Sequence, residues 1–127
     1  MLKMLVFVAI GGALGAMARH LTLAAVARVL GTGFPYGTLT VNILGSFILG
    51  LLVETMALKW NVSQEVRAMV AVGVLGAFTT FSSFSLDTIL QLERGNLGGA
   101  AVYVLSSVTF SVLGLFAGLR LARLVMA

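Results

Sequence analysis

The chain has 127 residues, of which 60% are hydrophobic and only 9% are charged. The hydrophobic fraction exceeds the half or less that is usual in water-soluble domains, so the composition indicates a single-domain membrane protein. The absence of cysteine excludes disulfides, thiolate metal sites and cysteine nucleophiles. The net charge of +4 comes from eight basic residues that are scattered along the chain, so no basic patch for nucleic acid is predicted.

Four hydrophobic stretches predict four transmembrane helices in one membrane domain, residues 1–127. A helix needs about 20 mostly apolar residues to cross a bilayer. Residues 4–30, 36–58, 68–92 and 97–121 meet this requirement and are separated by very short connections. The first stretch lacks the small-residue cleavage site of a secretory signal, so we expect it to be retained as a span. The predicted fold class is therefore an all-α membrane protein.

The basic residues are distributed unequally between the two sides of the predicted domain. An even number of spans places both termini on the side that also holds the loop between the second and third spans. That side carries Lys3, Lys59, Arg67, Arg120 and Arg123, and the other side carries Arg28 and Arg94. The positive-inside rule favours cytoplasmic termini, but the bias is small and both orientations of insertion remain open.

Paired glycines occur in the first and fourth spans. Gly11 and Gly15 in "GGALG", and Gly114 and Gly118 in "GLFAG", have the spacing that lets helix backbones approach closely. This spacing fits packing within one protomer and association between protomers equally well. Arg19 is the deepest basic residue, and it either raises the anion concentration at a pore mouth or extends its charged end to the interface.

The second span carries a polar face in the segment "GTLTVNILGSFILG". Thr38, Asn42, Gly45, Ser46 and Gly50 share this face of the predicted helix. A carboxamide in the middle of a membrane is costly unless it is hydrogen-bonded. Asn42 therefore either joins helices or presents its amide hydrogens to a polar species.

The third span contains an unusual density of hydroxyl groups in "GAFTTFSSFS". The hydroxyl residues are Thr79, Thr80, Ser82, Ser83 and Ser85. Because they follow Gly73 and Gly76, they predict a helix break within residues 76–80, where the hydroxyls supply partners for freed backbone groups. An unbroken helix with hydroxyls bonded to its own carbonyls is the alternative. Phe81 and Phe84 lie about 60° apart on one stripe, which suits lipid contact, packing or a pore wall.

The fourth span also has a narrow polar face. Tyr103, Ser107, Ser111, Gly114 and Gly118 lie within about 80° of one another on a helix. Three spans thus carry one polar face each, which fits either hydrogen bonding between helices or a narrow wet pathway. Since four helices of this length enclose no useful lumen, we expect any pathway to lie between protomers.

The scarcity of acidic residues indicates the sign of a permeant ion. Cation pathways use carboxylates or rings of carbonyls, whereas anion pathways use cationic groups and hydrogen-bond donors. Glu54 and Glu65 are expected near the ends of spans, and Asp87 is the only acid expected deeper within one. The positive edges of the Phe81 and Phe84 rings can also face an anion. The pattern therefore favours a small, poorly polarisable anion.

The segments "GGALGAMAR", "GTLTVNILGSFILG" and above all "GAFTTFSSFS", in this order, resemble the fluoride channel family known as Fluc or CrcB. The similarity covers essentially the whole chain. It implies an antiparallel, dual-topology homodimer with a broken third helix and two pores, which exports fluoride passively and lowers cytoplasmic fluoride. It also implies a multi-pass protein of the bacterial inner membrane that confers fluoride resistance.

The resemblance also implies roles for individual residues. The implied pore residues are Phe81, Phe84, Asn42, Thr80, Tyr103, Ser107 and Ser111, with Arg19 near the vestibule. The backbone carbonyls of Gly76 and Thr79 are the implied ligands of a structural sodium ion (Na+) at the dimer centre. Three positions depart from the pattern, since the family often has glycine at Ala77, tyrosine at His20 and glutamate at Asp87.

Two other functions fit the size and composition. A proton-coupled small multidrug exporter also has four spans, but it requires a carboxylate in the first span, where this chain offers only Arg19 and His20. A small membrane subunit without transport activity leaves the three polar faces unexplained. An enzyme is not expected, because one histidine, no cysteine and few acids form no familiar catalytic set.

Overall fold

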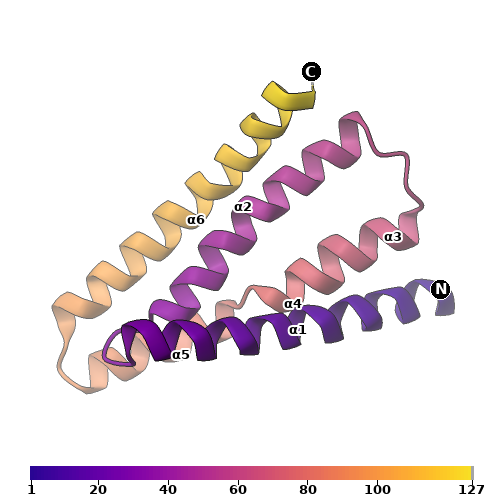
Figure 1. The fold of residues 1–127 in the computed structure, drawn as a ribbon. Helices are drawn as coiled ribbons and strands as arrows, with labels where there is room; N and C mark the ends of the chain where they lie inside the picture. The colour runs from indigo at the N-terminus through magenta and orange to yellow at the C-terminus, as the bar shows by residue number, and fades with distance from the viewer. Residues whose placement is uncertain (127) are drawn as a thin grey trace.

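The computed structural model describes residues 1–126, which are helical throughout apart from short connections (Figure 1). The first two helices are α1, Leu2–Leu30, and α2, Tyr36–Leu58. A composite third segment follows, made of α3 (Gln64–Ala68), the π-helix η1 (Met69–Leu75), α4 (Gly76–Phe78) and α5 (Phe81–Glu93). The last helix is α6, Leu97–Met126.

Four helical segments are long and apolar enough to cross a membrane. They are Leu2–Leu30, Tyr36–Leu58, the composite segment Gln64–Glu93 and Leu97–Met126. Each range predicted from the sequence coincides with one of these segments or lies within it. The connections at 31–35 and 94–96 meet at one end of the bundle, and both termini lie at the other end (Figure 1).

The helices associate as two main pairs. α2 packs along α6, and α1 packs against η1 and α4 of the composite segment. In Figure 1 the two pairs diverge toward the end that carries the termini. The first span is thus paired chiefly with the third, and the second chiefly with the fourth.

Glycines of α1 bring that helix into backbone contact with η1. A Cβ atom at Gly11 would collide with the carbonyl group of Met69, and one at Gly15 would collide with that of Val74. Any residue larger than glycine would therefore separate the helices. The "GGALG" motif thus packs within the chain, which resolves the alternative that the sequence leaves open.

The pair formed by α2 and α6 uses glycines in the same way. A Cβ atom at Gly118 would collide with the carbonyl oxygen of Phe47, and one at Gly50 would collide with that of Leu115. The two contacts are reciprocal, since each helix supplies one glycine and one carbonyl. Gly118 of "GLFAG" therefore also packs within the protomer.

The backbone leaves the helical conformation between α4 and α5. Thr79 has φ −86° and ψ 160°, and Thr80 has φ −154° and ψ 116°, so both residues are extended. Helix α5 then begins at Phe81, with the Thr80 hydroxyl accepting a hydrogen bond from the Ser83 N–H at 3.1 Å. These two extended residues, called the interruption below, lie within the range 76–80 that the sequence singles out.

Candidate functional site

Asn42 of α2 holds the interruption in place. Its Nδ2 donates to the Thr80 carbonyl at 3.0 Å, and its Oδ1 accepts from the Thr80 N–H at 2.7 Å. One carboxamide thus satisfies both backbone groups of an extended residue, which a membrane would otherwise leave without partners. Asn42 therefore joins α2 to the third segment, the first of the two roles considered from the sequence.

Two carbonyls beside the interruption lose their usual helical donors. In a continuous helix the Thr80 N–H would bond to the Gly76 carbonyl, but it donates to Asn42 instead. The Ser83 N–H would likewise bond to the Thr79 carbonyl, but it donates to the Thr80 hydroxyl. Side chains thus replace the helical partners of the two residues, Gly76 and Thr79, that the family resemblance implies as sodium ligands.

Small and back-bonded side chains let α2 approach this region. A Cβ atom at Gly45 would collide with the side-chain methyl group of Thr79. The Thr79 hydroxyl donates to the Leu75 carbonyl at 3.0 Å, so it is satisfied within its own helix. Gly45, one turn beyond Asn42, therefore provides the space in which the carboxamide reaches Thr80.

A pocket of about 320 Å³ lies beside the interruption, between α2, α5 and α6. We call it the central pocket. Its lining includes six of the seven pore residues predicted from the sequence: Asn42, Thr80, Phe81, Phe84, Ser107 and Ser111. The remaining wall is formed by Ser46, Leu49, Thr79, Val108 and Val112. The three polar faces of the sequence therefore meet around one space.

Two hydroxyls of the central pocket lack partners within the described part of the chain. Ser107 Oγ and Ser111 Oγ are buried and make no hydrogen bond. The neighbouring Ser106 behaves differently, because its hydroxyl donates to the Val102 carbonyl of its own helix at 2.6 Å. A buried hydroxyl without a partner is costly, so these two serines favour a polar occupant of the pocket.

The aromatic rings form a continuous series next to this pocket. Phe81 and Phe84 have ring centroids 5.5 Å apart, and Phe84 and Tyr103 have centroids 5.2 Å apart. Phe81 is 78% exposed in the single chain although it lines the pocket. The central pocket therefore opens onto the outer surface of the protomer.

Tyr103 is not part of the lining of the central pocket. It is fully buried behind Phe84, and its hydroxyl donates to Asp87 Oδ2 at 2.9 Å. The place on a polar track that the resemblance implies for Tyr103 stays a prediction. The sequence does not identify this pair, because the two residues lie 16 positions apart on different helices.

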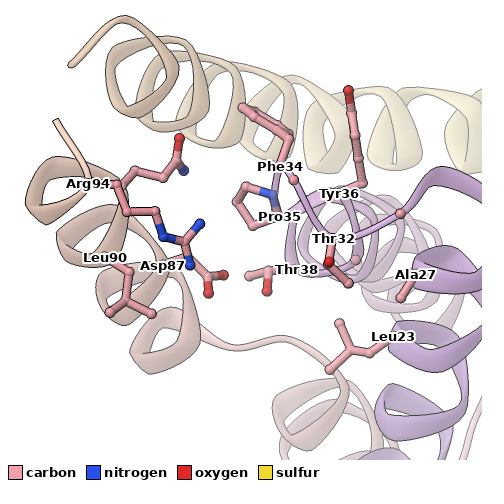
Figure 2. Close-up of a pocket in the computed structure, with 14 residues that line it drawn as sticks. Leu23, Ala27, Thr32, Phe34, Pro35, Tyr36, Thr38, Asp87, Leu90 and Arg94 are labelled. Atoms are coloured by element: carbon pink, nitrogen blue, oxygen red, sulfur yellow. The ribbon is translucent and has the colours of Figure 1, made fainter. Parts of the chain in front are cut away.

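Arg19 lies away from the central pocket. It is partly exposed on α1, and His20 beside it is exposed. Leu23 and Ala27, one and two turns further along the same face, line a second pocket of about 210 Å³. We call this the outer pocket, and Figure 2 shows the residues that surround it. By helical spacing, Arg19 shares a face of α1 with these two lining residues.

The described residues offer no side-chain metal site. Within residues 1–126, no group of three or more His, Asp or Glu side chains is placed to hold a metal ion. The carbonyls at the interruption belong to a different class of ligand, the backbone carbonyl, which that finding does not concern. Carbonyl oxygens suit a hard cation such as sodium.

Comparison with known proteins assigns the chain to a family. The family model described as "CrcB-like protein, Camphor Resistance (CrcB)" matches residues 6–119. The chain belongs to the CrcB family. The resemblance recognised in the sequence motifs is therefore confirmed.

Several curated relatives are named "Fluoride-specific ion channel FluC". The one from Chelativorans sp. (strain BNC1) is 57% identical over 119 residues, which cover 94% of this chain and 95% of that protein. The one from Rhodospirillum centenum is 53% identical over 99% of this chain and 100% of its own length. The one from Agrobacterium fabrum is 53% identical over 91% of this chain and 93% of its own length.

The family and the helices together define the class of protein. The relatives are named as ion channels, so the family is one of channels and not of enzymes. Four helices of this chain are long and apolar enough to cross a membrane. The chain is therefore a multi-pass membrane protein.

Proposed function

We propose that this chain forms a fluoride channel. The observation that carries the proposal is the central pocket, whose lining combines Ser107 and Ser111, with their unpaired hydroxyls, and the phenyl rings of Phe81 and Phe84. None of the described residues that line it is charged. The names of the relatives supply the identity of the ion.

The lining suits a small anion better than a cation. Hydroxyl groups and ring edges offer positive ends to an anion, whereas cation pathways concentrate carboxylates or carbonyls. The pocket also lacks a titratable side chain to couple transport to protons. Transport is therefore passive, and an inside-negative membrane potential drives the anion outward.

Two copies of the chain complete the pore. In a single protomer the central pocket is open on the side of Phe81, which is 78% exposed. A second copy covers this side and turns the pocket into an enclosed path. The small difference in basic charge between the two sides supports insertion in both orientations, and therefore an antiparallel homodimer with two pores.

A structural sodium ion binds at the dimer centre, where the third membrane-spanning segment is interrupted. The carbonyls of Gly76 and Thr79 have lost their helical donors to Asn42 and Thr80, and unpaired carbonyls in a membrane are costly. Gly76 is exposed in the single chain, so its carbonyl region is accessible to a partner. A monovalent cation shared by two copies satisfies several such carbonyls together.

The remaining residues act along the path. Ser107 and Ser111 are one turn apart on α6 and offer successive hydroxyls to fluoride. Tyr103, one turn before Ser107, packs on Phe84 and donates its hydroxyl to Asp87, so it bounds the path beyond the central pocket. Arg19 raises the local concentration of anions at the approach on α1.

Ion flux from liposomes tests the proposed function. Purified protein is reconstituted with internal fluoride or chloride, and efflux is followed with ion-selective electrodes after the counter-ion path is opened with a potassium ionophore. We expect rapid fluoride efflux, little chloride efflux and no requirement for a proton gradient. Comparable chloride efflux, or transport only with a proton gradient, contradicts a passive fluoride channel and would favour the exporter.

A further inference from the structure

The outer pocket lies at the end of the bundle where the 31–35 and 94–96 connections meet. Its walls are the last two turns of α5, the 31–35 connection, the first turn of α2 and one face of α1 (Figure 2). Its volume is about 210 Å³. A water molecule requires roughly 10–15 Å³ by a comparable measure, so the pocket has room for several.

Gln91 lines this pocket and is a buried residue whose side-chain polar atoms lack partners. The residue is 3% exposed, and neither Nε2 nor Oε1 of its side chain has a hydrogen-bond partner in the described chain. A buried carboxamide requires both an acceptor and a donor, and leaving them absent is costly. Water supplies both, and so does a hydrated ion.

The other polar groups around the pocket are balanced in charge. Figure 2 shows the carboxylate of Asp87, the guanidinium of Arg94 and the hydroxyl of Thr38 around the same space. One acid and one base give a lining without net charge. Such a lining attracts water and does not repel an anion as an isolated carboxylate would.

The outer pocket continues the line of the central pocket along α5. Phe84, Asp87 and Gln91 lie within about 60° of one another on this helix, and Arg94 directly follows its last residue. Phe84 lines the central pocket, whereas the other three line the outer pocket. Between the two pockets stands Tyr103, which packs on Phe84 and donates to Asp87.

We propose that the outer pocket is a hydrated chamber at the end of the ion path, and that Gln91 binds the water which solvates fluoride there. The inference rests on the proposed function, since it assigns the chamber to the same pore. In the central pocket the ion lies among hydroxyl-bearing side chains and phenyl rings. On passing Tyr103 it regains water that the Gln91 carboxamide holds in place.

Replacement of Gln91 by leucine tests its part in conduction. Leucine is similar in size and leaves no buried amide without a partner, so we expect Gln91→Leu to fold and assemble normally. Fluoride flux should fall about tenfold, because a lost hydrogen bond to a charged solute or its water is worth at least that factor. Gln91→Asn, which keeps the amide, should retain more flux. Gln64→Leu is the matched control, since Gln64 is exposed at the start of α3 and should leave flux unchanged.

Thiol reactivity tests the water independently of flux. The chain has no cysteine, so each substituted cysteine is the only thiol present. In membranes, Gln91→Cys should react with a small water-soluble methanethiosulfonate within about tenfold of the rate of exposed Gln64→Cys, because the reagent requires a hydrated thiolate. Leu105→Cys, which is on the outer face of α6 where Leu105 is 68% exposed, should react far more slowly in lipid.

The outcomes separate the chamber from the pore. Rapid reaction of Gln91→Cys together with reduced flux in Gln91→Leu supports the proposal. A reaction as slow as that of Leu105→Cys overturns it, and so does unchanged flux in Gln91→Leu. If the unsubstituted protein passes no fluoride, the proposed function fails, whereas the thiol reaction still decides whether the chamber holds water.

Discussion

At the scale of single residues, Asn42 has a more demanding role than donating to a passing ion. Its carboxamide makes two hydrogen bonds to Thr80, one as donor and one as acceptor. Only an amide side chain offers both at this spacing. Asn42 therefore shapes the wall of the central pocket through the backbone that it holds.

The variant Asn42→Asp replaces the donor with a second acceptor. A carboxylate oxygen would face the Thr80 carbonyl, and a negative charge would stand in the anion path, so we expect at least about a hundredfold loss of fluoride flux. We also expect a lower melting temperature. Flux from liposomes and thermal unfolding in detergent measure the two effects, and wild-type flux in an assembled variant would contradict the role of Asn42.

The unpaired hydroxyls predict an unusual separation of stability from function. Because Ser107 Oγ has no partner in the chain, Ser107→Ala should leave stability within about 0.5 kcal/mol of the wild type or increase it slightly. Fluoride flux should nevertheless fall several-fold, since one donor of the path is lost.

Ser106→Ala is the matched control for this variant. Ser106 lies next in sequence but bonds to its own helix, so its loss should leave fluoride flux unchanged. Equal flux in the wild type and in Ser107→Ala would remove Ser107 from the path.

At the scale of elements, the interruption exchanges helical hydrogen bonds for side-chain bonds. The Thr80 hydroxyl accepts a hydrogen bond from the Ser83 N–H, and the Asn42 side chain accepts one from the Thr80 N–H. Each exchange releases one carbonyl of the preceding turn. The same bonds that end α4 and begin α5 therefore create the proposed sodium ligands.

Sodium dependence should respond to Thr80 more than to Thr79. Thr80→Val removes the acceptor of the Ser83 N–H, which becomes free to bond to the Thr79 carbonyl, so the stabilisation by sodium should weaken or disappear. Thr79→Ser keeps its hydroxyl and supplies only its backbone, so its sodium dependence should match the wild type. The melting temperature is measured in sodium and in a large organic cation for each protein.

The wild-type protein provides the reference for this test. Replacing sodium with the larger cation should lower its stability or its flux without changing which anion passes. Wild-type stability that is the same in both salts would contradict a structural sodium ion, and so would sodium flux that accompanies fluoride.

The sequence predicts the spans and the position of the interruption, but not the contacts between distant residues, for physical reasons. Hydropathy places the four spans because the membrane requires long apolar helices. The hydroxyl-rich segment after Gly76 indicates where the helix is interrupted. Thr80, the partner of Asn42, however, lies 38 residues away in the chain. The Tyr103–Asp87 hydrogen bond and the outer pocket likewise depend on how the helices align with one another. Such alignments arise from packing that no local pattern contains.

At the scale of the whole molecule, the single chain exposes the wall of its own pocket. Phe81 lines the central pocket and yet is largely exposed. The modest excess of basic residues on the side of the termini leaves both orientations of insertion open. Both features are explained together if two copies inserted in opposite orientations cover one another.

Charge variants that fix the orientation test this arrangement. Asn61→Lys strengthens the basic excess on the side of the termini. Combined replacement of Lys3, Lys59 and Arg120 by glutamine with Leu97→Lys reverses the excess. We expect each variant alone to give little fluoride flux, and co-expression of the two to restore it. Full flux from either variant alone, with its orientation verified by accessibility, would contradict the dual-topology dimer.

The pairing of α1 with the third segment and of α2 with α6 bears on how the chain is made. Each main partner is the next helix but one, so during synthesis neither pair closes until the third span has entered the bilayer. Gly11 and Gly15 have no backbone to pack against until η1 is made, and Gly50 has none until α6 is made. Nascent chains therefore pass through a stage in which two helices, with their small-residue faces uncovered, rest against lipid or the insertion machinery. Of the helices described here, α6 is made last, and its insertion completes the pair with α2.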